Sequence, residues 1–107
     1  MEAELRRLRD EARAQVERLE RDLHGLFEAA RASNADDEHD PEGNTIGYER
    51  AQLTAVLDAT RRSVADLDDA LARLAAGRYG VCERCGRPSP AERLVARPAA
   101  RTCVTCA

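Results

Sequence analysis

Apolar residues recur at steps of three and four along two long stretches of the chain. In the first, from Glu2 to about Ala32, the steps follow a heptad with one extra step of four, which locally unwinds a supercoil. This stretch has no Pro, and its one Gly is Gly25. The pattern predicts a long amphipathic helix. Its apolar positions are Leu5, Leu8, Ala12, Val16, Leu19, Leu23, Leu26 and Ala30.

The second stretch alternates steps of four and three without interruption. It predicts a helix from Thr45 to Ala76, with Gly77 in the C′ position that ends helices. An earlier start is also open, because Asp40 and Pro41 form a plausible N-cap and first-residue pair. The positions of the stripe are Leu53, Leu57, Thr60, Val64, Leu67, Leu71 and Leu74.

The two helices have matched lengths, which favours an antiparallel coiled-coil hairpin with arms of about 45 Å each. We expect a monomer, although either stripe could instead pair with another chain. The hairpin, residues 1–76, would place its tip at residues 33–44, with a separate domain at residues 77–107. Acid–base pairs four residues apart are expected on the outer faces: Glu2/Arg6, Glu17/Arg21, Asp58/Arg62 and Asp69/Arg73.

Composition changes this picture in one respect. The chain has two Tyr, one Phe and no Trp, so its core is poor in large side chains and an additional cross-link, such as a bound metal ion, is expected.

The charged N-terminus shows no apolar signal segment, and no apolar run approaches the ~20 residues that span a bilayer. We therefore expect a cytoplasmic protein without a membrane segment, where paired cysteines are more often metal ligands than disulfides.

Charge is distributed unevenly along the chain. Residues 1–76 are acidic, whereas residues 77–107 carry six Arg and two acids. All basic residues of the chain are Arg. Non-specific DNA binding along the chain is therefore not expected, nor is a sequence-specific DNA contact.

Four cysteines stand in two C-x2-C pairs: Cys82 with Cys85, and Cys103 with Cys106. Two such turns can present four thiolates to one metal ion, and this spacing is typical of structural Zn²⁺ sites without an open position. Gly86 follows the second cysteine, where a tight turn needs it. Two disulfides or a redox-active C-x2-C pair are the alternatives. We expect one structural Zn²⁺.

Residues 77–107 also resemble the signature of the TraR/DksA zinc-finger family. The resemblance rests on Gly77, Tyr79, Gly80, the four cysteines, Gly86, Arg93, Leu94, Ala96, Arg97, Pro98 and the spacing between them. It implies a regulator that binds bacterial RNA polymerase, inserts its coiled-coil tip into the secondary channel and modulates initiation. Members of the family often act together with the alarmone guanosine tetraphosphate.

The segment between the two predicted helices is strongly acidic. The resemblance implies that acids at the tip face the polymerase active site, and the candidates are Asp36, Asp37, Asp40 and Glu42. Well-studied members carry Asp-x-x-Asp-x-Ala there, whereas Asp40 is followed by Gly43 and Thr45 at those positions. The chain also stops at Ala107, before the helix with which longer members continue, so alarmone dependence is left open.

Two arginines of the family signature, Arg93 and Arg97, have two interpretations. They could form a contact patch for an acidic protein surface or for nucleotide phosphates, or they could brace the finger. No nucleophile–base pair or phosphate loop is visible, so we do not expect an enzyme. The alternative function is a zinc-capped coiled-coil adaptor or thiol-based redox sensor acting on another protein.

Overall fold

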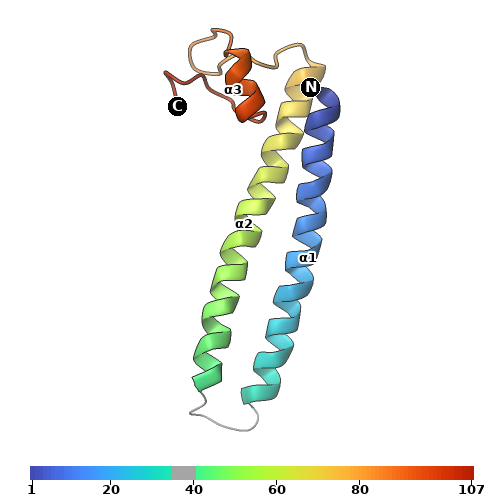
Figure 1. The fold of residues 1–107 in the computed structure, drawn as a ribbon, viewed down its shortest axis with the longest axis vertical. Helices are drawn as coiled ribbons and strands as arrows, with labels where there is room; N and C mark the ends of the chain where they lie inside the picture. The colour runs from blue at the N-terminus through green and yellow to red at the C-terminus, as the bar shows by residue number, and fades with distance from the viewer. Residues whose placement is uncertain (35–40) are drawn as a thin grey trace. The chain divides into compact units, whose positions relative to one another are not determined.

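The computed structural model describes residues 1–34 and 41–107, with side chains for residues 1–32 and 45–107. It contains three helices in these ranges, α1 (Glu2–Asn34), α2 (Pro41–Ala75) and α3 (Ala91–Ala96). The chain forms two compact units, residues 12–62 and residues 1–11 with 63–107. Figure 1 shows the course of the chain through these elements.

The unit of residues 12–62 consists of the later part of α1 and the earlier part of α2. The predicted stripe positions of both helices are buried or half-buried here, and Leu57 is only 3% exposed. Thr60 is also buried, and its hydroxyl donates to the Val56 carbonyl at 2.8 Å. That internal bond satisfies the hydroxyl, which explains how a threonine occupies an apolar stripe. An ion pair between Glu20 and Arg61 links the two helices at 2.9 Å.

The other unit joins the start of α1, the end of α2 and the finger, which we define as residues 77–107. Its most buried apolar side chains include Leu5 and Leu67, which lie on the predicted stripes, and Ala70, which the predicted stripe did not include. Each unit thus pairs one end of α1 with the opposite end of α2, so the helices are antiparallel. This confirms the predicted mainly α fold, a helical hairpin with a small C-terminal four-cysteine finger.

The ends of α2 were predicted with mixed success. The start at Thr45 is wrong, because α2 begins at Pro41, where the fixed φ of proline suits the first helical residue. The end is confirmed: Gly77 has φ 73°, and the N–H groups of Gly77 and Arg78 donate to the carbonyls of Leu74 and Arg73. This pair of bonds is a Schellman motif, and the left-handed backbone explains the glycine.

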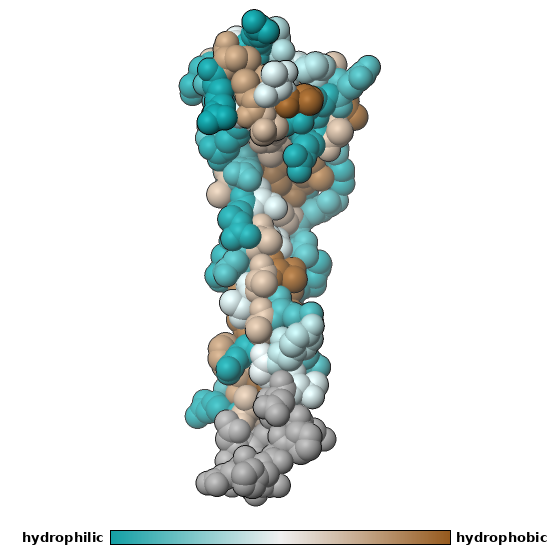
Figure 2. All heavy atoms as spheres, turned by 90° about the vertical axis from the view of Figure 1, so that its left-hand side faces the viewer, coloured by the Kyte–Doolittle hydropathy of each residue, from teal (hydrophilic) through white to brown (hydrophobic). Residues whose placement is uncertain are grey.

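Hydrophilic residues occupy much of the face shown in Figure 2, with small apolar areas between them. Within the described residues, no helix combines the length and apolar character needed to cross a bilayer. Among the predicted surface pairs, Glu2 and Arg6 are confirmed as an exposed pair at 2.8 Å. Asp36, Asp37 and Asp40 lie outside the described residues, and Glu42 lies in α2 without a described side chain.

A substitution at Leu57 tests the helical interface. Leu57→Ala should lower the free energy of unfolding by about 2–5 kcal/mol, because a nearly fully buried leucine is removed. Urea unfolding followed by far-UV circular dichroism measures it. The neighbouring Val56 is 45% exposed, so Val56→Ala should cost about 0.5 kcal/mol. Equal losses from the two variants would contradict the assigned faces.

Candidate metal centre and its anchoring to α2

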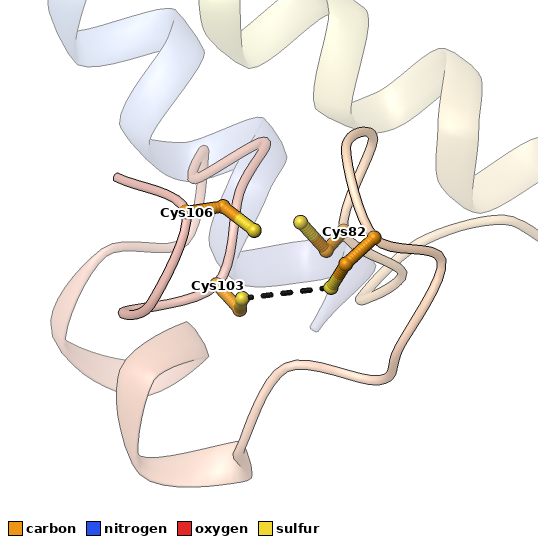
Figure 3. Close-up of side chains that lie close together, drawn as sticks. Cys82, Cys103 and Cys106 are labelled. Atoms are coloured by element: carbon orange, nitrogen blue, oxygen red, sulfur yellow. Dashed lines mark hydrogen bonds between the residues drawn. The ribbon is translucent and has the colours of Figure 1, made fainter.

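The sulfur atoms of Cys82, Cys85, Cys103 and Cys106 form one cluster in the finger (Figure 3). All four lie within 4.8 Å of one another, and those of Cys85 and Cys103 are 3.7 Å apart. Zinc–sulfur bonds of about 2.3 Å in a tetrahedron require sulfurs about 3.8 Å apart. The four free thiols therefore fit one tetrahedral Zn²⁺, and with four protein ligands such a site is structural.

Two short turns present the ligands. In the first, Gly86 has φ 72°, and its N–H donates to the Cys82 carbonyl at 3.0 Å. In the second, the N–H of Cys106 donates to the Cys103 carbonyl at 3.1 Å. The positive φ confirms the predicted role of Gly86, because a side chain is disfavoured in that conformation.

The surroundings of the cluster shift the pKa values of Cys82 and Cys106 in opposite directions. The pKa of Cys82 is lowered to about 6, first by the backbone N–H of Cys85 and then by that of Cys103, which stabilise the thiolate. The pKa of Cys106 is raised to about 12, first by hydrogen bonding with the Cys103 side chain and then with that of Cys82. Zinc binding must therefore displace the Cys106 proton, which a bound divalent cation favours.

Residues 98–102, which we call the anchor segment, lead directly into Cys103. Three of their carbonyl oxygens accept hydrogen bonds from side chains elsewhere in the same unit. The Tyr79 hydroxyl donates to the Pro98 carbonyl at 2.9 Å. Arg73 Nη1 donates to the Ala100 carbonyl at 3.4 Å, and Arg93 Nε donates to the Thr102 carbonyl at 2.9 Å. A fourth carbonyl, that of Arg101, accepts from the N–H of Glu83, beside Cys82, at 2.9 Å. The anchor segment thus links α2 to both cysteine turns.

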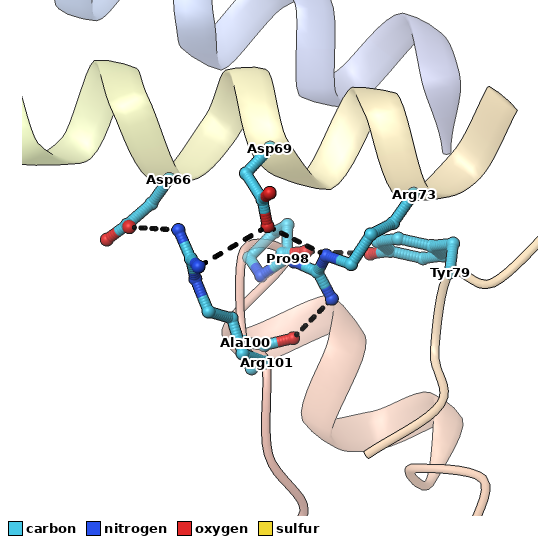
Figure 4. Close-up of polar contacts among 7 residues, drawn as sticks. All are labelled: Asp66, Asp69, Arg73, Tyr79, Pro98, Ala100 and Arg101. Carbon is cyan, nitrogen blue, oxygen red and sulfur yellow. Dashed lines mark hydrogen bonds and ion pairs between the residues drawn. The ribbon is translucent and has the colours of Figure 1, made fainter. Parts of the chain in front are cut away.

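Carboxylates of α2 complete this network (Figure 4). Arg101 Nη2 lies 3.0 Å from Asp66, and its Nη1 lies 3.6 Å from Asp69. Asp69 also accepts from Arg73 Nε at 3.0 Å. Asp69 is therefore shared between an arginine of α2 and one of the anchor segment.

The predicted placement of the Asp69/Arg73 pair on an outer face is wrong. Arg73 is only 5% exposed, and its Nη1 donates to the Ala100 carbonyl of the anchor segment. Spacing alone does not reveal this burial, because the pair has the same spacing as the exposed Glu2/Arg6 pair. Tyr79 is also half-buried, and burial raises the pKa of its phenol. Tyr79, which follows a helix-ending glycine closely, was one available hint of a structural role here.

The two arginines predicted as a contact patch differ in their surroundings. Arg93 is half-buried and braces the Thr102 carbonyl, whereas Arg97 is exposed. Both line an open hollow of about 650 Å³, together with Arg101 and the acidic residues Asp66 and Glu83. The hollow therefore has mixed charge, and the assignment of Arg93 and Arg97 to a binding patch stays a prediction.

Comparisons with known proteins agree with this geometry. The family model of the prokaryotic dksA/traR C4-type zinc finger matches residues 77–107. The solved structure of the transcription factor DksA2 from Pseudomonas aeruginosa is similar over 97% of this chain and 80% of its own, with a TM-score of 0.58 and 27% sequence identity. The class of protein is thus a helical hairpin with a four-cysteine zinc finger.

Two curated relatives show the same likeness in sequence. General stress protein 16O of Bacillus subtilis (strain 168) is 35% identical over 77 residues, which cover 72% of this chain and 47% of the relative. An uncharacterized protein of Aquifex aeolicus (strain VF5) is 48% identical over 42 residues, or 39% of this chain and 29% of the relative. The chain thus spans less than half the length of either curated relative. The family match assigns the finger, residues 77–107, to the DksA/TraR zinc-finger family, and the fold of the chain is similar to that of DksA2.

Removing one ligand tests the metal centre. Cys106→Ser should reduce bound zinc from about one ion per chain to a small fraction, because a structural site needs all four thiolates. Elemental analysis after dialysis against a mild chelator measures the content. Thr105→Ala changes the exposed neighbouring residue and should keep the zinc. Full zinc retention by Cys106→Ser would contradict the assigned ligand set.

Proposed function

We propose that this protein is a transcription regulator that binds bacterial RNA polymerase directly. The observation that carries the proposal is the likeness to a transcription factor over 97% of the chain, combined with the zinc finger of the DksA/TraR family. A helical hairpin alone would be weak support, since folds host many functions.

In the proposed mechanism, the hairpin enters the secondary channel and the acidic segment approaches the active centre. The negative charge of the segment would act on the metal ion or the nucleotide phosphates there. The acids proposed to carry this charge are Asp36, Asp37, Asp40 and Glu42. The segment connects Asn34 of α1 to Pro41 of α2. A helical hairpin with an acidic connecting sequence suits a role in which charge is delivered into a confined channel.

The finger would dock on the outside of the channel. Its arginines, among them the exposed Arg97, would face an acidic protein surface, and no sequence-specific DNA contact is needed. The zinc ion would hold the finger together and take no part in chemistry, because its four protein ligands leave no open position. We therefore propose that the protein is a regulator and not an enzyme. As a partner of RNA polymerase it would act in the cytoplasm.

The departures from the family pattern bear on how the acidic segment would act. Gly43 and Thr45 occupy the positions of the second Asp and the Ala, and both lie inside α2. We therefore propose that the charge is supplied by Asp36, Asp37 and Asp40, which precede α2 in the sequence, together with Glu42 in its first turn. Dependence on guanosine tetraphosphate is tested separately, by measuring transcription with and without it.

Charge removal in the acidic segment tests the mechanism. The Asp36/Asp37/Asp40→Asn variant should lose most of the effect on multi-round transcription from a ribosomal-type promoter, measured with and without guanosine tetraphosphate. It should still co-purify with core polymerase, because the proposed docking contacts lie in the finger. Glu17→Gln with Asp22→Asn removes exposed charges of α1 and should leave the effect unchanged. Equal transcription effects from wild type and the triple variant would contradict the role of these carboxylates.

A crosslinking experiment separates channel entry from other modes of binding. A photoreactive residue placed near the acidic segment should crosslink beside the polymerase catalytic Mg²⁺. Crosslinks confined to other regions of the polymerase would overturn the channel model but keep the partner. Failure to co-purify would overturn the partner as well.

The second candidate function is a thiol-based sensor or adaptor that acts on another protein. One observation favours it: Cys85 is exposed, and its sulfur is 3.7 Å from that of Cys103. Peroxide could oxidise these two thiols to a disulfide while being reduced to water, and the zinc would be released. Zinc release at low peroxide with a change in partner binding would support this function, and an inert site would exclude it.

A further inference from the structure

The contacts of the anchor segment show how the second cysteine pair is held in place. Its backbone makes no strand pairing among the described residues, where the finger has one isolated bridge, between Val81 and Pro88. Carbonyl groups in such a segment need donors from elsewhere. Those of Pro98, Ala100 and Thr102 receive them from side chains outside the segment.

Arg73 is the donor that reaches the anchor segment from α2. Its guanidinium is buried, with Nε on Asp69 and Nη1 on the Ala100 carbonyl, three residues before Cys103. Its Nη2 has no hydrogen-bond partner within the part of the chain that the structure describes. Burying a guanidinium with an unsatisfied nitrogen is costly, so stability alone is a poor reason for an arginine at this position.

We propose that Arg73 is a positioning residue for the zinc site and couples zinc binding to the last turns of α2. By holding the Ala100 carbonyl, it fixes the backbone before Cys103, so that Cys103 lies near the other three ligands before zinc binds. This preorganised backbone favours zinc binding. In other metal sites, groups that orient the ligands by hydrogen bonds likewise raise the affinity for the metal. Bound zinc in turn holds the anchor segment against Arg73 and Asp69.

Such coupling is reciprocal. If closure of α2 raises the affinity for zinc by some factor, bound zinc must lower the equilibrium constant for the opening of α2 by the same factor. Hydrogen exchange of the amides in residues 67–75 reports that opening, since they lie in the final turns of α2. The coupling concerns folding and metal binding only, and so does not depend on the proposed partner.

The test compares Arg73→Met with wild type. Methionine keeps an apolar stem but loses the guanidinium. We expect the zinc dissociation constant, measured by competition with a chromophoric chelator, to rise about tenfold or more, within the ~10–100-fold seen when such supporting residues are changed. The zinc-dependent slowing of exchange at residues 67–75 should shrink by a similar factor. Arg73→Lys keeps the positive charge but lacks the planar guanidinium. Its zinc dissociation constant and its zinc-dependent slowing of exchange should lie between those of wild type and Arg73→Met.

Arg61→Met is the matched control, because Arg61 is an exposed arginine of α2 whose ion pairs are with Glu20 and Asp58, away from the anchor segment. It should change neither readout. A purely structural role for Arg73 would raise exchange equally with and without zinc and leave the zinc-dependent difference intact, which would overturn the proposal. Unchanged zinc affinity in Arg73→Met would do the same.

A second variant covers the case in which Arg73→Met does not fold. Tyr79→Phe removes one hydroxyl, which donates to the Pro98 carbonyl of the same segment. It should weaken zinc binding and zinc-dependent protection in the same direction, by a smaller factor. Wild-type values for both readouts would show that the anchor segment does not set the zinc affinity.

Discussion

The shortage of large apolar side chains is the constraint on which this structure depends. Among the described residues, the buried apolar side chains are Leu5, Leu57, Leu67, Ala70 and Cys82. A chain of 107 residues with so small a core gains little from burial alone, and α1 with α2 must rely on long, repetitive pairing. The finger has even less to bury, so its fold rests on metal binding and on polar contacts with α2.

Arginine suits those polar contacts for a physical reason. The finger consists mostly of turns, which leave carbonyl groups without partners from a helix or sheet. A guanidinium offers five donors in a fixed plane and can serve a carboxylate and a carbonyl together. Arg73 does so between Asp69 and Ala100, and Arg101 spans Asp66 and Asp69. The basic character of residues 77–107 thus has a structural component, beyond any role in binding a partner.

The sequence was sufficient to predict features that depend on local geometry. Both apolar stripes, the left-handed glycines Gly77 and Gly86 and the gathering of four cysteines follow from periodicity, backbone sterics and ligand spacing. The start of α2 was misplaced because its first turns lie ahead of the stripe that begins at Leu53, whereas the proline signal at Pro41 was correct.

The burial of Arg73 could not be predicted in this way. Its contact with the finger is with the Ala100 carbonyl, 27 residues away in sequence, and depends on how the finger folds onto α2. In the sequence, Asp69 and Arg73 form one of several equivalent pairs four residues apart. Only the tertiary contact separates this pair from the exposed Glu2/Arg6 pair.

Two physical roles are proposed for Asp40 in the acidic segment, and substitutions at this position can separate them. Asp40 stands immediately before Pro41, the first residue of α2, where a side-chain oxygen can cap the helix. The same carboxylate is a proposed charge at the polymerase active centre. Asparagine caps a helix about as well as aspartate but carries no charge, so Asp40→Asn leaves capping nearly intact while the electrostatic role is lost. Alanine would remove both, at a cost of about 1 kcal/mol to the helix start. A functional loss on substitution by asparagine is therefore evidence for charge, and one seen only with alanine is evidence for capping.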